Sequence, residues 1–407
     1  MRVRVGFDVT ALYVARAGVF TYRARLACAL AETAPQHDYV WLDYRPARGP
    51  AADPPEVQVL GAVLHCRGLR HCRLARWDLL QPPPWRALAA LVDRALLWPW
   101  AVAAGGVMRR RLSAALEGVD VFHASAVLPW RQPGAANVIT IHDLSALQFP
   151  ELHTPNNREL HRRACRFAQE EADSVIVVSE ATRRAVVADL GIPAQRVYVV
   201  YNGVDAAFRP LADREAVVRT LAPFGLVPGQ YILHVGTLEP RKNLERLVSA
   251  YAGVRQALSS LAPTLVLVGA KGWGYRSLFE RVDALGLAGH IRFLDWVPAE
   301  ALLALYNGAV LFVYPSLYEG FGLPPLEAMA CGVPVLASDA ASLPEVVGEA
   351  GLLLPPEDTT AWTDAIVALL RDPARRDALR QAGLARAARF SWARAARETL
   401  AVYTAAK

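Results

Sequence analysis

Short apolar runs alternate with longer segments of helical period along the whole chain. Most of the apolar runs are of strand length and lack a polar face, which is typical of strands buried on both sides of a parallel sheet. We expect strands at residues 1–10, 119–123, 136–142, 174–179 and 197–200, and again at 231–235, 265–269, 291–294, 310–314 and 333–337. Strands that alternate with helices predict an α/β fold.

Glycine and proline mark a division between two halves. The segment 201–210, YNGVDAAFRP, lies between the last strand expected in the first half and the first expected in the second, and it is typical of a linker. A chain of 407 residues is long enough for two domains that each bury their own core. We therefore predict two doubly wound, Rossmann-like domains facing a cleft, residues 1–204 and 205–388.

A glycine loop follows the strand expected at 310–314. Gly320 and Gly322 permit backbone paths that other residues avoid, and Pro324 and Pro325 favour the start of a helix. A glycine loop that leads into a helix presents backbone N–H groups and the positive end of the helix dipole. The sequence therefore predicts an anion-binding site here.

Two carboxylates bracket this loop, Glu319 before it and Glu327 inside the helix, with seven residues between them. A carboxylate beside a bound anion would repel it, so we interpret both as acceptors for the hydroxyl groups of a sugar or ribose. The alternative is that Glu319 is a solvated loop residue and Glu327 a carboxylate favoured by the helix dipole.

Three other positions combine a strand end with a chemically useful side chain. Arg241 and Lys242 precede a helix expected from about residue 243, where cations can meet a diphosphate. His142 ends the strand expected at 136–142, and such ends line the ligand crevice of doubly wound folds. Gly18 stands between a strand and a helix expected at 20–32, although it could be a simple turn glycine. The alternatives are that Arg241 and Lys242 form a solvated cation pair and that His142 is a structural histidine.

The run EGFGLPPLEAMACGVPVLASD resembles the E-x7-E signature of retaining, nucleotide-sugar-dependent glycosyltransferases of the GT-B fold, family 4. The resemblance implies that Glu319 lies against the donor sugar and that Glu327 binds the ribose hydroxyls. It also implies a C-terminal helix within 389–407 that crosses back to the N-terminal domain, and further roles as follows. The loop from Gly320 through Phe321 and Gly322 to Leu323 would hold sugar hydroxyls and phosphate, and Arg241 and Lys242 would bind the diphosphate. Gly18 and Gly236 would lie near the donor phosphates, and His142 would lie beside the donor sugar. Trp296 and Val297 would hold the nucleobase.

One position departs from the family pattern. Many members carry an additional arginine directly after the glycine that ends the first strand of the second domain, whereas Thr237 follows Gly236 here. This departure leaves more of the charge compensation to Arg241.

The charge balance narrows the choice of partners. The formal net charge is +6, which suits nucleic acid, anionic lipid or a polyanionic substrate, and nucleic acid is the weakest of these because no reader motif accompanies the charge. Residues 67–111 interleave tryptophans and arginines, among them Trp98 and Trp100, and end in Arg109, Arg110 and Arg111. Such a segment can lie at an anionic membrane surface, or it can form two core helices with solvated arginines.

The remaining expectations concern location and chemistry. No opening signal segment precedes the first strand, and the five scattered cysteines favour reduced thiols, so we expect a cytoplasmic protein, peripheral on the inner face of the plasma membrane. No D-x-D pair suggests a metal, and no cofactor is expected. The predicted reaction moves a sugar, with mannose from a GDP-sugar as first choice, to a polyprenyl-linked glycan such as an O-antigen. A UDP-sugar with a soluble acceptor, or a non-catalytic sugar-nucleotide-binding protein, is the alternative.

Overall fold

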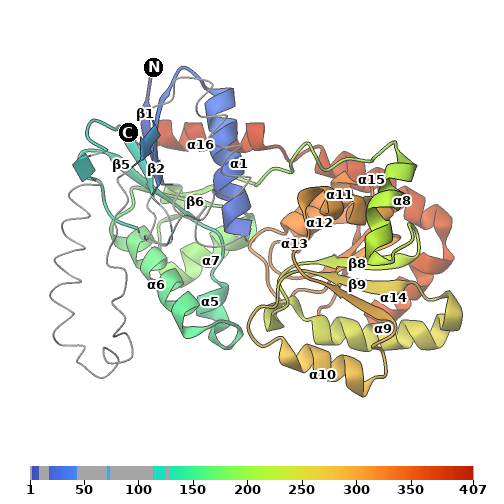
Figure 1. The fold of residues 1–407 in the computed structure, drawn as a ribbon. Coiled ribbons are helices and arrows are strands. Elements are labelled where there is room, and N and C mark those ends of the chain that lie inside the picture. Colours follow the sequence, from blue (N-terminus) through green and yellow to red (C-terminus); the bar gives the residue numbers. More distant parts are fainter. Residues whose placement is uncertain are drawn as a thin grey trace, which may run out of the picture.

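The computed structural model describes residues 2–8, 18–43, 71–73, 113–114, 116–124, 126 and 129–406. Two lobes stand side by side, each with its own parallel sheet (Figure 1). Most residues of the central strands are buried, as expected from runs that lack a polar face.

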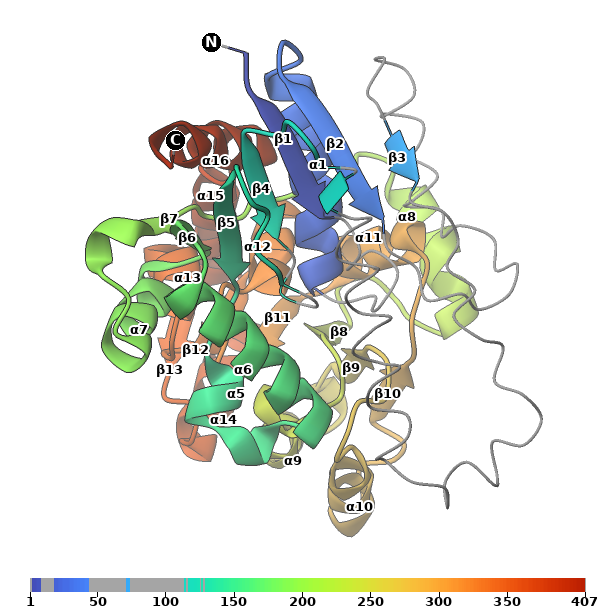
Figure 2. The same ribbon diagram turned by 90° about the vertical axis from the view of Figure 1, so that its left-hand side faces the viewer.

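The first sheet has the strand order β3-β2-β1-β4-β5-β6-β7, with every described pair parallel (Figure 2). Its strands are β1 (Arg4–Asp8), β2 (Asp38–Asp43), β3 (His71–Arg73), β4 (Val121–Ala124), β5 (Ala136–Ile141), β6 (Ser174–Val177) and β7 (Val197–Val199). The helices beside it are α1 (Gly18–Thr33), α5 (Ser145–Gln148), α6 (Pro155–Glu170) and α7 (Glu180–Leu190), with the short 3-10 turns η2 (Pro150–Leu152) and η3 (Ala194–Arg196). The apolar faces of α6 and α7 pack on one side of the sheet, and α1 packs on the other.

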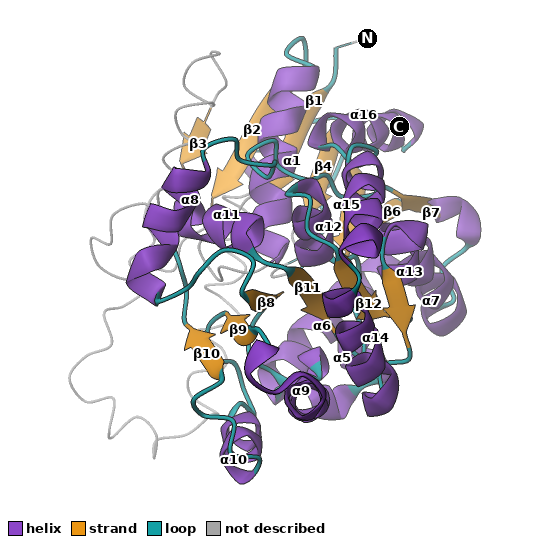
Figure 3. Cartoon of the chain, turned by 90° about the vertical axis from the view of Figure 1, so that its right-hand side faces the viewer, coloured by secondary structure: helices purple, strands orange, loops and turns teal. Residues whose placement is uncertain are grey.

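The second sheet has the order β10-β9-β8-β11-β12-β13, again parallel throughout (Figure 3). Its strands are β8 (Tyr231–Val235), β9 (Thr264–Val268), β10 (Ile291–Leu294), β11 (Leu311–Tyr314), β12 (Val335–Ser338) and β13 (Leu352–Leu354). The helices are α8 (Arg214–Leu221), α9 (Leu244–Leu258), α10 (Arg276–Ala284), α11 (Ala299–Gly308), α12 (Leu323–Ala330), α13 (Leu343–Val347) and α14 (Thr359–Arg371), and the 3-10 turns are η4 (Ala222–Phe224), η5 (Pro240–Lys242), η6 (Ser259–Leu261) and η7 (Gly348–Ala350).

The last two helices connect the lobes. Helix α15 (Pro373–Ala387) packs on α12 in the second lobe, and α16 (Trp392–Ala405) returns to pack against α1 in the first (Figure 1). The two crossing segments touch backbone to backbone, because Val204 pairs with Ser391. A Cβ at Gly203 would lie 2.1 Å from the backbone nitrogen of Trp392, so only glycine fits this junction.

The strands and helices expected from periodicity are present, with shifts at their ends. The α/β architecture of two parallel-sheet lobes and the returning C-terminal helix are confirmed. Except for the backbone of β3, the tryptophan- and arginine-rich segment 67–111, with Trp98, Trp100 and Arg109 to Arg111, lies outside the described residues. Within the described ranges we find no helix with the length and hydropathy needed to span a bilayer.

Candidate functional site

The glycine loop lies at the carboxyl end of β11, at the centre of the second sheet. Gly322 takes the left-handed conformation, with φ of 105°, at the N-cap of α12, and no side chain caps that end of the helix. The hydroxyl of Ser342 lies 2.8 Å from the backbone oxygen of Glu319 and 2.9 Å from that of Phe321, and these contacts help to hold the loop in its conformation. Pro324 and Pro325 carry no N–H, so the first turn of the helix offers the N–H of Leu323, and no side chain caps this end. This N–H and the positive end of the helix dipole are what an anion would meet here.

Two cations clamp the carboxylate of Glu319. Lys242 Nζ lies 2.6 Å from Oε1, and Arg241 Nη1 lies 2.9 Å from Oε2. Glu239 accepts a further hydrogen bond from Arg241 Nη2 at 2.8 Å. Lys242 and Glu319 are only 7% and 8% exposed, so this ion cluster sits in an environment that screens it weakly.

The protonation states in the cluster follow from this pairing. Burial alone would raise the pKa of Glu319, but Arg241 and Lys242 lower it to about 2. Burial lowers the pKa of Lys242 against the opposing effect of Glu319, whereas Glu319 and Glu239 raise the pKa of Arg241 despite burial. Near neutral pH the carboxylate is therefore charged, and each of its oxygens already accepts from one cation, which leaves acceptor capacity on both.

Sequence reasoning missed the aromatic residues that support Lys242. Its ammonium donates a hydrogen bond to the Tyr314 hydroxyl at 2.7 Å, and Tyr314 stacks on His234 with ring centroids 5.3 Å apart. Burial lowers the pKa of His234 to about 3, so it adds no competing charge beside Lys242. Because Tyr314 ends β11, its place at a strand end could have marked it as a candidate.

His142 meets the glycine loop from the opposite lobe. A Cβ at Gly320 would lie 2.0 Å from the backbone oxygen of His142, so the backbones of the two lobes are in direct contact here. The ring of Tyr22 packs edge-on against the His142 imidazole at 4.7 Å. Burial, together with Arg23, lowers the pKa of His142 to about 3, and its Nε2 has no hydrogen-bond partner among the described residues. A neutral imidazole in this position can exchange a hydrogen bond with a ligand hydroxyl.

Asp143 directly follows His142 after the end of β5. Its Oδ1 accepts hydrogen bonds from the backbone N–H of Ser145 at 2.9 Å and from the Ser145 hydroxyl at 2.6 Å. This pattern is typical of an aspartate that caps a turn. The structure therefore gives Asp143 a local partner in α5.

Glu327 lies on α12 with Oε2 2.9 Å from the Tyr306 hydroxyl, which donates to it. Burial raises the pKa of Glu327 to about 7, against the opposing effect of the Tyr306 hydrogen bond. Its carboxyl group therefore titrates near neutrality, unlike that of Glu319. Tyr306 belongs to α11 and carries no sequence signal that would have pointed to it.

The other candidate residues are more dispersed. Gly236 follows β8 and lies against the Lys242 stem, since a Cβ there would be 3.5 Å from Lys242 Cε. Trp296 and Val297 follow β10, three strands from β11, with Trp296 54% exposed and Val297 buried. Gly18 begins α1, and no atom of the described residues lies within 4 Å of the place a Cβ would take.

The side chain of Phe321 points away from the ion cluster. The Phe321 ring packs between Tyr201 and Phe390 at the crossing segments, and the partly buried Leu323 packs against the same core. Any contact of Phe321 with a donor must therefore come from its main chain. The structure thus gathers Glu319, Gly320, Arg241, Lys242 and His142 at one point, where an anion and a polyhydroxylated group could bind together.

Comparisons with known proteins agree with this geometry. Residues 17–208 match the family model "Glycosyltransferase Family 4", and residues 227–386 match "Glycosyl transferases group 1". Among curated proteins, the O-antigen chain mannosyltransferase B of Escherichia coli is 37% identical over 266 residues, which cover 65% of this chain and 69% of the relative.

Solved structures share the whole architecture. A sucrose-phosphate synthase of Thermosynechococcus elongatus is 24% identical, with a TM-score of 0.72 over 99% of both chains. HepE of Anabaena, solved in complex with UDP and glucose, is 19% identical, with a TM-score of 0.70 over 99% of this chain and 100% of HepE. At these identities the likeness shows a common GT-B fold.

Proposed function

This chain belongs to glycosyltransferase family 4, and from that premise we propose that it transfers mannose or a related sugar from a GDP-sugar to a glycan of bacterial surface polysaccharide, with retention of configuration. Membership rests on the family models and on the mannosyltransferase relative. The donor, the acceptor and the stereochemistry belong to the proposal.

The observation that carries the proposal is the clamp of Arg241 and Lys242 on Glu319 beside the free start of α12. A diphosphate leaving group gains negative charge as its bond to the sugar breaks. Two fixed cations and backbone N–H groups, held ready before the reaction, stabilise that charge without reorganising. In the proposal, this arrangement replaces the divalent cation that other transferases use.

The state of Glu319 supports retention without a covalent intermediate. A carboxylate that two cations already engage, with its pKa held at about 2, is a weak nucleophile. Its oxygens are better suited to fixing the hydroxyls of the donor sugar next to His142. In the proposal the leaving phosphate takes the proton of the incoming acceptor hydroxyl on the same face of the sugar, so that one bond forms where the other breaks.

Donor identity is tested by a panel of nucleotide sugars. We expect GDP-mannose to raise the melting temperature and to support glycosyl transfer, in line with the mannosyltransferase relative. The Glu327→Ala variant serves as control, because it should weaken stabilisation by every nucleotide by about 1–3 kcal/mol. Turnover with UDP-sugars alone would establish the second candidate, which the UDP complex of HepE favours. If donors bind but none is turned over, the result would favour a non-catalytic sugar-nucleotide-binding protein.

For the acceptor, we propose a polyprenyl-linked glycan at the cytoplasmic face of the plasma membrane. The support is the O-antigen name of the E. coli relative and the interleaved tryptophans and arginines of residues 67–111. A basic aromatic surface can dock reversibly on anionic lipid without a spanning helix.

A further inference from the structure

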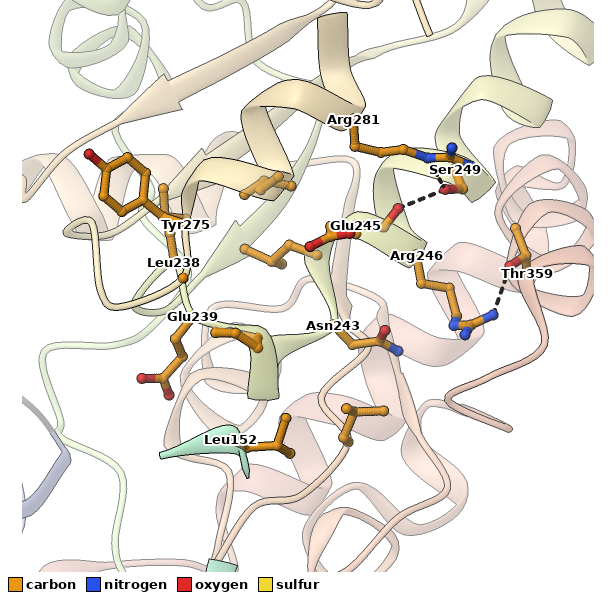
Figure 4. A pocket seen from close by; sticks show the side chains of 15 residues that line it. Leu152, Leu238, Glu239, Asn243, Glu245, Arg246, Ser249, Tyr275, Arg281 and Thr359 are labelled. Carbon is orange, nitrogen blue, oxygen red and sulfur yellow. Dashed lines mark hydrogen bonds between the residues drawn. The ribbon is translucent and has the colours of Figure 1, made fainter. Parts of the chain in front are cut away.

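A cavity of about 590 Å³ lies beside the ion cluster, on the other side of η5. Glu239 and Asn243 line it (Figure 4). Arg241 and Lys242, which lie between them in the chain, bind Glu319 instead. The volume falls within the range of roughly 300–1,000 Å³ that small-molecule sites occupy. The cavity also extends to the first lobe, since Leu152 of η2 lines it.

The polar side chains around the cavity are held in place by hydrogen bonds. Arg281 Nε donates to the Ser249 hydroxyl at 3.0 Å, and Arg246 Nη1 donates to the Thr359 hydroxyl at 3.2 Å (Figure 4). Glu245 accepts a hydrogen bond from the Ser277 hydroxyl at 2.6 Å. A guanidinium has five donors and a carboxylate has about four acceptor sites, so these bonds leave capacity for a ligand.

The balance of charge in the lining favours a neutral ligand. Two arginines, Arg246 and Arg281, face two glutamates, Glu239 and Glu245, so the cavity has both strong donors and strong acceptors and no excess of either sign. An anion would gain from the arginines and be repelled by the glutamates. A sugar hydroxyl both donates and accepts, and therefore pairs with both.

Apolar groups complete the lining. The rings and side chains of Tyr275, Leu238 and Leu278 supply non-polar surface between the charged groups. A pyranose has this same mixture, because its hydroxyl edge is polar and its C–H faces are apolar. Ligand sites are commonly built in this way, from apolar walls with a few convergent polar groups.

We infer that this cavity is a second carbohydrate site, which holds sugar residues of the acceptor glycan beyond the one that reacts. The inference rests on the proposed glycosyl transfer. Glu239 connects the two sites, because it lines the cavity and also binds Arg241 of the ion cluster. A glycan bound there would touch both lobes, through Leu152 on one side and η5 on the other, and would favour the closed arrangement of the domains.

The test uses the full chain saturated with GDP, with α-linked mannobiose and mannotetraose as probes, followed by calorimetry or saturation-transfer NMR. We expect the tetrasaccharide to bind more tightly than the disaccharide. Ser249→Trp, which fills the cavity from α9, should weaken tetrasaccharide binding by at least about tenfold, and Tyr275→Ala should also weaken it. Arg276→Ala is the matched control, since Arg276 is exposed on the same helix as Arg281 and does not line the cavity.

The outcomes separate this inference from the proposed function. Binding that Ser249→Trp and Tyr275→Ala both remove, with unchanged melting temperature and GDP affinity, supports the site. Absence of binding to the parent, or binding that neither variant alters, overturns it. If the probes bind as expected but no nucleotide sugar is turned over, the carbohydrate site stands and the proposed transfer falls.

Discussion

The two glutamates of the E-x7-E run differ sharply in their surroundings. Glu319 meets two cations, which hold its pKa at about 2, whereas Glu327 meets a neutral Tyr306 and has its pKa raised to about 7. The first is a permanent anion between pH 5 and 9, and the second gains or loses its proton in that interval. The same residue type therefore has two electrostatic roles eight positions apart.

Nucleotide affinity should depend on the protonation of Glu327. A ribose diol needs a charged acceptor, so GDP should bind about tenfold more weakly at pH 6 than at pH 8, because only about a tenth of a carboxyl with a pKa near 7 is ionised at pH 6. Isothermal calorimetry at the two pH values measures this.

Glu327→Gln is the matched control, because it keeps an oxygen for the Tyr306 hydroxyl but cannot ionise. Any titration of the GDP phosphates, whose second pKa is about 6, appears in both proteins and cancels in the comparison. A pH dependence that is the same in parent and variant would contradict the ribose role of Glu327.

The charge of Lys242 should matter more to turnover than to binding. Lys242→Met is expected to lower kcat by roughly 100-fold, by analogy with the loss of one oxyanion donor, while the Kd for GDP changes less. Tyr314→Phe removes only the hydroxyl that lies 2.7 Å from the Lys242 ammonium, and it should lower kcat by about tenfold or less. Chelator should leave the parent rate unchanged, and a strict requirement for magnesium or manganese would contradict the proposed role of the two cations.

At the scale of elements, a carboxylate of one lobe caps a helix of the other. Glu345 of α13 accepts hydrogen bonds from the backbone N–H groups of Glu180 and Ala181 at the start of α7, at 2.7 and 2.5 Å. The Tyr201 hydroxyl also donates to it at 3.2 Å. Ser342, just before α13, supports the glycine loop, so this helix links the donor site to the contact between the lobes.

Loss of this cap should favour an open arrangement. Glu345→Ala leaves two amides at the α7 start without their acceptor, and we expect a larger radius of gyration by small-angle X-ray scattering and a fall in kcat/KM of roughly tenfold. Glu349→Ala is the control, since Glu349 is exposed one turn further on. Identical scattering from Glu345→Ala and the parent would show that the cap does not hold the lobes together.

At the scale of the whole molecule, α16 is tied to the first lobe by a buried polar chain. The Tyr403 hydroxyl lies 2.7 Å from His123 Nδ1, His123 Nε2 lies 2.8 Å from the Thr140 hydroxyl, and Thr140 lies 2.8 Å from the hydroxyl of Tyr22. Burial holds the pKa of His123 well below its usual value, so its ring stays neutral. Tyr22 in turn packs against His142, so the returning helix supports the candidate catalytic histidine.

Breaking this chain should destabilise the fold. Tyr403→Phe leaves His123 Nδ1 buried without its partner and should lower the free energy of unfolding by about 1–3 kcal/mol, measured by urea denaturation. Thr404→Val is the control, because Thr404 is exposed and its hydroxyl donates to the backbone oxygen of Leu400 in the same helix. Equal stabilities of the two variants would show that these buried hydrogen bonds add nothing to the free energy of unfolding.

Docking on a membrane would involve the whole protein and is tested by sedimentation. The parent should sediment with anionic liposomes at low salt and be released as salt rises, since each basic residue near the surface contributes about 1 kcal/mol. Replacing Arg109, Arg110 and Arg111 with glutamate should abolish sedimentation and leave GDP binding intact. If the parent did not sediment with the liposomes, residues 67–111 would be better explained as core helices. A soluble acceptor would then become the better hypothesis.

Much of the architecture could be predicted from the chain alone. The strand at 231–235, the helix at 180–190 and the glycine loop between β11 and α12 all follow from hydrophobic period and from the conformations that glycine and proline allow. These signals are local, because the side chains that create them lie within a few residues of each other. Residue type next to strand ends also marked Arg241, Lys242 and His142, and the glycine loop marked Glu319.

Only the tertiary structure decided which of these groups meet and in what state. The ion pair between Lys242 and Glu319 joins residues 77 positions apart, and the Glu345 cap on Ala181 spans 164. Asp143 accepts a hydrogen bond from Ser145, the Phe321 ring packs against Phe390, and the Tyr306 hydroxyl donates to Glu327. Distances and burial of this kind arise from the packing of separate elements, and they set pKa values and hydrogen-bond partners that no local pattern contains.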